Sequence, residues 1–459
     1  MSQQHIPSES DVLQQAALDH MWMPTQAFSK IAEDGVRIIT EGQGTKLKDI
    51  DGVWRYDGSA GLMLVNVGHG RQEIVDAISA QLSRLHYADT FSYGTPDVIR
   101  FGAKLAYLTP GDLNRVLFVS GGSEAVESAL KIAYQYHVNR GEPGRVKFIA
   151  RQGSYHGVSR GALSVGTANV LAHETWAPIL PDTSRFAPQP LLYRDDESAT
   201  QEENDIRCAQ AIEDIIVAEG ADTVAAVIAE PISLSAGVAI PGDRYWPMLR
   251  EICDRHGVLL IADEVITGFG RTGKWFAMEH WGVTPDLMTL AKGITSGYWP
   301  TGACIVTDKV FDAFKGGPET TYTHGFTYGG HPAAGAAGLA NVAIMEREDL
   351  PGNAARMGKR MLDRLQSLRK HALVGDVRGI GLLCAVELVK DKTTKEPFNS
   401  IEGAAKLLKD RITERGMLTR AGNIILLVPP LTVTEHEVDE MVDIVDEAIT
   451  FVEEQLGLG

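Results

Sequence analysis

The sequence is short of cysteine, of basic residues and of long apolar runs. Its 459 residues include four cysteines without a CxxC pair or a Cys/His cluster, namely Cys208, Cys253, Cys304 and Cys384. We therefore expect neither a disulfide framework nor a bound metal, and we expect a cytoplasmic protein. Because 43 basic residues stand against 60 acidic ones, the net charge is −17 and nucleic acid is not an expected partner.

The apolar runs are too short for a membrane segment. Runs such as Val258–Ala262 fall far below the about 20 apolar residues that a membrane helix needs. The N-terminal residues also lack the basic and apolar regions of a secretory signal. We therefore expect a globular protein without a membrane partner.

From residue 115 onward, short apolar runs alternate with helical patterns. Strands are expected at 116–119, 146–149, 223–229, 258–262, 287–290 and 303–306, and helices near 124–139, 206–218 and 245–256. Gly141 and Gly257 stand where two of these helices should end. The alternation predicts an α/β fold, with a mainly parallel central sheet and helices on both faces.

The two ends of the chain have a different pattern. The first dozen residues are polar and expected to be loose, and short strands are expected at 36–39, 46–50 and 53–56 with Asp51-Gly52 as a hairpin turn. After Gly330 come helices, a strand at 382–389 and a last helix opened by the capping box Thr434-Glu-His-Glu437. We predict a small domain of α+β type, built from an N-terminal segment (1–65) and residues 329–459, and a large domain at 66–328.

A lysine follows one of the expected strands. Lys292 comes directly after 287–290 and before a glycine, with no other charge between Asp286 and Asp308. Most lysines are solvated, and that alternative stays open for Lys292 taken alone. At the C-terminal end of a strand in an open α/β sheet, however, a side chain points toward the ligand crevice. A desolvated amine there loses proton affinity and can form a Schiff base.

An acid follows a second strand. Asp263 comes directly after 258–262 and could simply cap a turn. In a crevice it could instead pair with a cationic ring nitrogen. At about 4 Å and an effective dielectric constant of about 20, such a pair is worth about 4 kcal/mol. That is roughly three pKa units, enough to keep a pyridine nitrogen protonated at neutral pH.

Three further features are weak singly. The segment Ser120-Gly-Gly-Ser-Glu124 joins a strand to a helix and could hold one phosphate, but it lacks the spacing of a Walker or a dinucleotide motif. Tyr155 could stack on a planar ring, and the loop residue Arg420 could bind a carboxylate. With a reactive lysine and an acid for a pyridinium, the set fits pyridoxal 5′-phosphate (PLP).

An ordered series of motifs also resembles a known family, the class-III aminotransferases of PLP fold type I, and especially the ω-amino acid and amine:pyruvate transaminases. The resemblance runs from about Phe28 to the C-terminus. Its markers are Asp49-Ile-Asp-Gly52, Val65-Asn-Val-Gly68, Ser120-Gly-Gly-Ser-Glu124, Tyr155-His-Gly157, Glu230-Pro-Ile232, Asp263-Glu-Val-Ile-Thr-Gly-Phe-Gly-Arg-Thr-Gly273, Leu290-Ala-Lys-Gly293 and Gly325-Phe-Thr-Tyr-Gly-Gly-His-Pro332.

The resemblance implies roles for matching residues. Lys292 would bind the cofactor covalently and act in catalysis together with Asp263, which would hold the pyridine nitrogen. The cofactor would further be bound by Gly122, Ser123, Tyr155, Glu230, Val265 and, from the neighbouring subunit of a homodimer with shared active sites, Thr327. The substrates, a small amine donor and a keto acid such as pyruvate, would meet Met63, Phe91, Tyr155 and Arg420.

Some residues depart from the family pattern. Ser233 stands where many relatives have Gln after Glu-Pro-Ile, and Ile266 replaces the Gln of ornithine- and 4-aminobutyrate-type members. Met63 replaces a bulky Trp that is frequent in amine transaminases. A PLP-dependent mutase or decarboxylase on the same fold is an alternative. A nicotinamide-dependent oxidoreductase is a more distant one, because Glu73 stands where the fingerprint that begins Gly68-His-Gly70 needs its third glycine.

Overall fold

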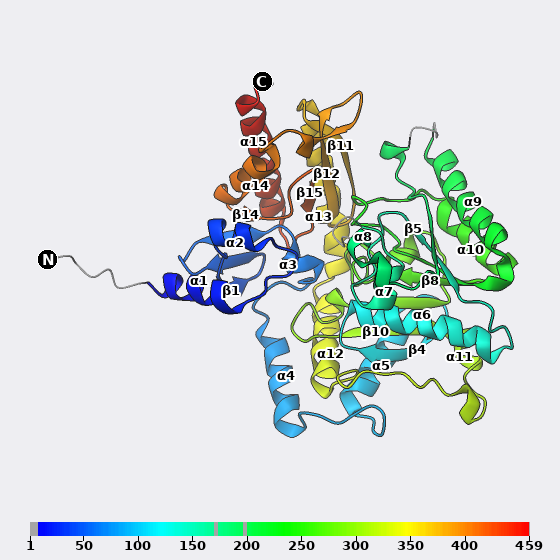
Figure 1. Ribbon diagram of the computed structural model, residues 1–459. Coiled ribbons are helices and arrows are strands. Elements are labelled where there is room, and N and C mark those ends of the chain that lie inside the picture. Colours follow the sequence, from blue (N-terminus) through cyan, green and yellow to red (C-terminus); the bar gives the residue numbers. More distant parts are fainter. Residues whose placement is uncertain (1–7, 169–172, 196–199, 459) are drawn as a thin grey trace.

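A seven-stranded sheet forms the centre of the molecule (Figure 1). The computed structural model describes residues 8–168, 173–195 and 200–458. The strand order is β4-β10-β9-β8-β7-β5-β6, and β10 alone runs antiparallel to its two neighbours. The strands are β4 (Leu113–Val119), β5 (Lys147–Arg151), β6 (Ser184–Ala187), β7 (Val224–Ala229), β8 (Leu259–Asp263), β9 (Leu287–Leu290) and β10 (Gly302–Thr307). The expectation of a mainly parallel sheet is confirmed.

Helices cover both faces of this sheet because its central strands are apolar on both sides. In β7, Ala226 and Ile228 pack with α6 (Gly122–Asn139), while Val227 and Ala229 pack with α9 (Gln201–Glu219) and α10 (Tyr245–His256). This alternation follows from the two-residue period of a strand. Gly257 ends α10 in the left-handed conformation, as its position in the sequence predicts.

The two chain ends meet in a second region. β1 (Ile39–Gln43), β2 (Lys46–Asp49) and β3 (Trp54–Asp57) form a meander, and β3 pairs in parallel with β14 (Met417–Leu418). A further sheet contains β11 (Val374–Ile380), β12 (Leu383–Asp391), β13 (Glu396–Pro397) and β15 (Ile424–Leu427). These pairings support the proposed domain limits at 1–65, 66–328 and 329–459, which stay a proposal.

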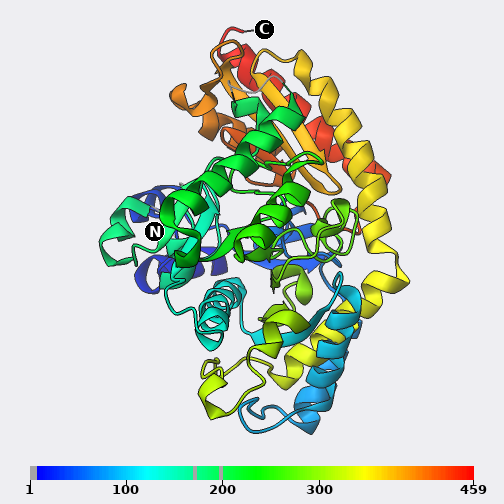
Figure 2. The same cartoon turned by 90° about the vertical axis from the view of Figure 1, so that its right-hand side faces the viewer.

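Long helices connect and cover the two regions. α12 (Pro332–Arg347) packs on α4 (Gln72–Arg84) and α5 (Pro96–Leu108), and α13 (Leu350–Gln366) continues along the same side of the molecule (Figure 2). α14 (Ala404–Glu414) and α15 (Glu435–Gln455) complete the C-terminal part, and the Thr434–Glu437 capping box opens α15 as predicted. The shorter helices are α2 (Phe28–Asp34), α3 (Ala60–Met63), α7 (Arg160–Ser164), α8 (His173–Trp176) and α11 (Asp308–Asp312).

Several elements differ from the sequence-based expectation. Within the first dozen residues, which were expected to be loose, helix α1 (Glu9–His20) already begins, because Ser8 and Asp11 form a capping box. The first strand begins at Ile39 rather than running over 36–39. Helix α5 and strands β6, β11 and β15 were not predicted. Within the described ranges, no helix combines the length and the apolar character needed to cross a lipid bilayer.

One glycine contact is tight enough to test the packing of α13. A Cβ atom on Gly358 would lie 2.1 Å from the backbone carbonyl of Gly381, between β11 and β12. Because backbone cannot move aside cheaply, Gly358→Ala should lower the free energy of unfolding by about 1–3 kcal/mol. Denaturant titration of the purified protein measures this loss. Gly144→Ala is the control, since its Cβ would meet only one atom, at 3.7 Å; equal losses in both variants would contradict the packing argument.

Candidate active site

The parallel strands bring the predicted site residues to one edge of the sheet. Asp263 is the last residue of β8, Glu230 follows β7, and Tyr155 lies in the loop after β5. Lys292 begins a 3₁₀ turn (Lys292–Ile294) just after β9, and Gly122 begins α6 after β4. Such a convergence of carboxyl ends is where open α/β sheets bind ligands.

Lys292 is held in an unusual backbone conformation and is partly buried. Its φ of 51° lies in the left-handed region, and Asn341 of α12 fixes the turn by donating to the carbonyls of Gly293 (2.9 Å) and Ile294 (3.2 Å). Burial lowers the pKa of the Lys292 amine to about 8, although the Asp263 carboxylate acts in the opposite direction. A substantial fraction of the amine is therefore uncharged near neutral pH.

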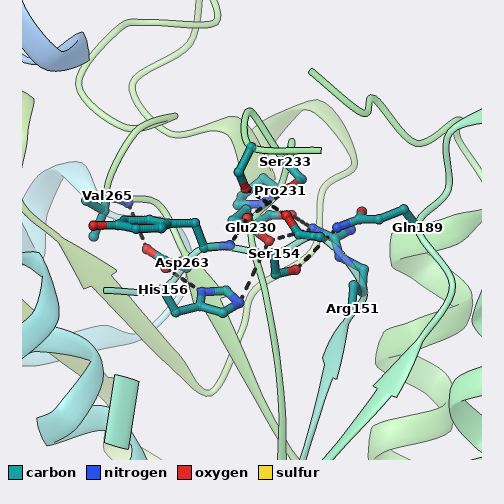
Figure 3. Close-up of polar contacts among 12 residues, drawn as sticks. Arg151, Ser154, His156, Gln189, Glu230, Pro231, Ser233, Asp263 and Val265 are labelled. Atoms are coloured by element: carbon teal, nitrogen blue, oxygen red, sulfur yellow. Dashed lines mark hydrogen bonds and ion pairs between the residues drawn. The ribbon is translucent and has the colours of Figure 1, made fainter. Parts of the chain in front are cut away.

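Asp263 is a buried carboxylate that three donors orient. His156 Nδ1 lies 2.6 Å from Oδ2, while the Thr289 hydroxyl (2.9 Å) and the Val265 amide (3.2 Å) donate to Oδ1. Thr289 reaches it because the two residues are paired in register between β8 and β9. Figure 3 shows Asp263 between Val265 and His156. The carboxylate is therefore fixed in position before any ligand arrives.

Behind Asp263 lies a line of buried charges. His156 Nε2 is 3.8 Å from Glu230 Oε2, and Arg151 Nη2 is 3.2 Å from the same oxygen. Glu230 Oε1 accepts from the Ser233 hydroxyl (2.9 Å) and from the Tyr155 amide (3.2 Å). Burial opposes ionisation of Glu230, but His156 and Arg151 lower its pKa on balance. Glu230 thus orients the loop that carries Tyr155 and His156 (Figure 3).

The first turn of α6 is a further part of the candidate site. No side chain caps the first turn of α6, so its amide groups are available to an anion. The Ser123 hydroxyl accepts from the Val158 amide (3.0 Å), which leaves its own proton free to be donated. A Cβ on Gly122 would lie 3.2 Å from Val265, and one on Gly121 would meet nothing within 4 Å. The backbone at the start of α6 is therefore open to space at Gly121 and close to Val265 at Gly122.

Arg420 acts electrostatically on both Tyr155 and Lys292. Burial raises the pKa of Tyr155, which Arg420 counteracts and Asp263 reinforces. The Arg420 side chain is exposed and also lowers the pKa of Lys292. Among the hydrogen bonds and ion pairs of the described residues, its guanidinium has no acidic partner. It is therefore a cation available beside the amine.

Met63 forms part of an apolar wall. Its side chain is buried among Ile232, Leu234 and Leu426, and Ile266 packs against the same cluster. Its φ of 60° places the backbone in the left-handed region. At the two positions where relatives carry Gln, this chain therefore has an aliphatic side chain in the wall and, at Ser233, a hydroxyl turned to Glu230.

Phe91 and Thr327 lie together on an exposed surface. The Tyr87 hydroxyl donates to the Thr327 carbonyl (2.7 Å), and a Cβ on Gly325 would meet the Phe91 ring at 2.9 Å. The Phe91 side chain is 67% exposed. The structure thus brings together the two loops that carry these residues, and no hydrogen bond or ion pair of the described residues joins either of them to Lys292.

Sequence reasoning missed three residues of the site. His156 and Arg151 were visible only as polar residues at or after the end of an apolar strand, and Thr289 could be found only from the pairing of β8 with β9. The Gly68-His-Gly70 segment does not form a phosphate loop, because Gly44 pairs with His69 there. Within the described ranges, no cluster of three His, Cys, Asp or Glu side chains could hold a metal.

The chain is similar to several known proteins over most of its length. A family model described as aminotransferase class-III matches residues 28–449. A putrescine–pyruvate aminotransferase of Pseudomonas aeruginosa is 36% identical over 96% of each chain. Among solved structures, an (S)-enantioselective ω-transaminase from Thermomicrobium roseum has a TM-score of 0.94 and 38% identity, covering 97% of this chain and 100% of that one. An amine transaminase from an uncultivated Pseudomonas species, in a PLP-bound form, has a TM-score of 0.91 and 42% identity over 94% and 99% of the chains.

The lowered pKa of Lys292 gives a pH dependence. At pH 8 about half of this amine is uncharged, against less than about 1% for a lysine with an ordinary pKa of about 10.4. Trapping of Lys292 with a small aldehyde and cyanoborohydride should therefore rise with pH with a midpoint near 8, as measured by mass spectrometry of the Lys292 peptide. Exposed lysines in the same digest are the reference.

A matched variant tests the direction in which Asp263 shifts the pKa of Lys292. In Asp263→Asn the midpoint should move below that of the wild type, because the carboxylate stabilises the ammonium form. A midpoint near 10 for Lys292 in the wild type, or an upward shift in Asp263→Asn, would contradict the assignment.

Proposed function

Because this chain belongs to the class-III aminotransferases, which depend on PLP and transfer amino groups to keto acids, we propose that it moves the amino group of an ω-amino acid or amine to pyruvate, with Lys292 as its reactive amine. The observation that carries the proposal is the desolvated Lys292 amine beside the fixed Asp263 carboxylate. An amine and an acid in this relation are the two protein groups that PLP chemistry requires.

The residues of the site fit this cofactor. Asp263 would hold the pyridine nitrogen, and the uncapped first turn of α6 with the Ser123 hydroxyl would hold the phosphate. The space at Gly121 and Gly122 supports that assignment, because a Cβ on Gly122 would crowd Val265. Tyr155 and Val265 would contact the two faces of the ring, and Glu230 would support Tyr155 from behind.

Lys292 is suited to move the proton of the reaction. When bound, PLP provides an electron sink for the bond that breaks at the amine-bearing carbon of the donor. Lys292 Nζ, with a pKa of about 8, is able both to accept a proton from that carbon and to return it. Asp263 is buried and Lys292 is partly buried, which would limit the access of water to these groups.

Arg420 would bind the carboxylate of the keto acid or amino acid. Its exposed guanidinium lies near Lys292 and Tyr155, without an acidic partner among the described residues, which supports this role. Met63 and the apolar cluster around it would contact the body of the donor. The acceptor is proposed as pyruvate on the name of one relative, and the donor class on its likeness to ω-transaminases.

A homodimer is proposed as the functional unit. The loops around Phe91 and Thr327 pack on each other and expose large apolar side chains, including Tyr93 (67%) and Tyr328 (67%). Such clustered exposure marks an interaction surface. We propose that Phe91 and Thr327 enter the site of the neighbouring subunit, Thr327 at the phosphate and Phe91 at the substrate.

We also propose a cytoplasmic location. The four cysteines are free and buried, which supports a reducing compartment.

Lys292→Ala tests the function directly. This variant should lose both the visible absorption band of the protein-bound cofactor and amine:pyruvate transamination, because no other residue replaces its amine. The assay follows alanine formation from pyruvate with a panel of donors that includes putrescine, β-alanine and 1-phenylethylamine. Lys274→Ala, an exposed lysine in the same domain, should retain both properties. Full activity in Lys292→Ala would overturn the proposal.

Arg420→Ala tests the carboxylate site. The loss of kcat/KM should be about 10- to 100-fold for pyruvate and for ω-amino acids, since hydrogen bonds to charged groups contribute about 1.5–3 kcal/mol. Donors without a carboxylate should lose much less in the half-reaction. Arg415→Ala, in the same segment but paired with Glu447, is the control. Equal losses for charged and uncharged donors would show that Arg420 does not bind the carboxylate.

A further inference from the structure

His156 lies between two carboxylates, all three side chains being buried. Its Nδ1 is 2.6 Å from Asp263 Oδ2, and its Nε2 is 3.8 Å from Glu230 Oε2. Figure 3 shows the imidazole between these two acids, with Arg151 beyond Glu230. The geometry raises the question of which ring nitrogens of His156 carry a proton.

The hydrogen-bond pattern decides this question. An ionised carboxylate only accepts, so the short contact to Asp263 requires a proton on Nδ1. In a neutral imidazole, Nε2 would then present a lone pair toward the Glu230 carboxylate, which repels it. No donor among the described residues lies within hydrogen-bond distance of Nε2. Only the imidazolium, with a proton on each nitrogen, faces both acids with an N–H group.

The surrounding charges favour the same form. Burial opposes protonation of His156, but the Glu230 and Asp263 carboxylates outweigh it and raise its pKa, while Arg151 partly counteracts them. These are the charged groups that act on the imidazole. The Arg151 guanidinium also makes cation–π contacts, because it lies 5.8 Å from the centre of the Tyr245 ring and 6.0 Å from the centre of the Trp246 ring.

We propose that Glu230 is a positioning residue that keeps His156 as an imidazolium, and that this imidazolium holds Asp263 in its ionised form toward the cofactor. The cation touches Asp263 directly, so it stabilises the carboxylate more than it disfavours a positive ring nitrogen farther away. Asp263 then accepts a hydrogen bond from that nitrogen without taking its proton. The inference rests on the proposed function.

The free acceptor site of Asp263 agrees with this role. Each carboxylate oxygen accepts about two hydrogen bonds. Oδ1 already accepts from Thr289 and from the Val265 amide, whereas among the described residues His156 alone donates to Oδ2. The remaining site is therefore on Oδ2, the oxygen that His156 contacts.

Nuclear magnetic resonance of the holoenzyme labelled with ¹⁵N-histidine tests the inference. The His156 signals are assigned by their loss in His156→Asn. In the wild type, both ring nitrogens should stay protonated above the pH at which a free histidine, with a pKa of about 6.5, loses its proton. In Glu230→Gln, the titration of His156 should move to lower pH than in the wild type, because one of its two anions is gone.

Matched variants separate the charge of Glu230 from its other contacts. Ser233→Ala removes a hydrogen bond to the same carboxylate but leaves its charge, so the His156 titration should stay near that of the wild type. Glu230→Asp should restore most of the shift. Because Glu230→Gln leaves Arg151 buried without its anion, the double variant Arg151→Met/Glu230→Gln provides a second measurement, again with a downward shift.

Two results would overturn the inference. One is a neutral His156 in the wild type, and the other is an unchanged imidazolium in both variants that lack the Glu230 charge. Steady-state kinetics adds a further check, since Glu230→Gln should lower kcat with little change in KM for the donor. The titration requires no turnover, so it can be measured even if the protein does not catalyse the proposed reaction. Failure of the proposed function and failure of this inference are therefore distinguishable.

Discussion

The site depends on a partly buried lysine amine that lies within the electrostatic reach of a buried aspartate carboxylate. Burial of Lys292 disfavours its ammonium form, and Asp263 alone among the charges acting on it favours that form. The balance leaves a pKa of about 8, where the amine can both bind an aldehyde carbon and exchange a proton. The parallel sheet creates this balance, because β8 and β9 are adjacent and end at the same edge.

Burying Asp263 imposes a chain of further requirements. The charge of Asp263 is compensated by His156, the charge of His156 by Glu230, and the charge of Glu230 by Arg151. Each of these residues comes from the end of a strand or the loop after it, so one sheet edge supplies both the acid and its compensation. The same charges orient the Tyr155 loop through Glu230. The same buried residues therefore compensate the charge of Asp263 and position the Tyr155 loop.

The sequence predicts the features that local pattern controls. The alternation of apolar runs and helices predicts that β7, β8, β9 and β10 are strands. The position of Lys292 and Asp263 after an expected strand identifies them as candidate site residues. Helix α5 and strands β6, β11 and β15 escape, because short or mixed segments form these elements only through tertiary contacts. Thr289 escapes for a similar reason, since its part follows from strand register alone.

The departures from the family pattern acquire a physical meaning in three dimensions. Ser233 donates to Glu230, so a short side chain at this position supports the buried charges instead of reaching into the open site. Ile266 and Met63 share one apolar cluster, so the wall they form offers no hydrogen-bond donor. An unbranched methionine adapts its shape more readily than a rigid indole. If the proposed function holds, selection among donors would come from shape along this wall and from the charge of Arg420, two contacts that discriminate by different physical means.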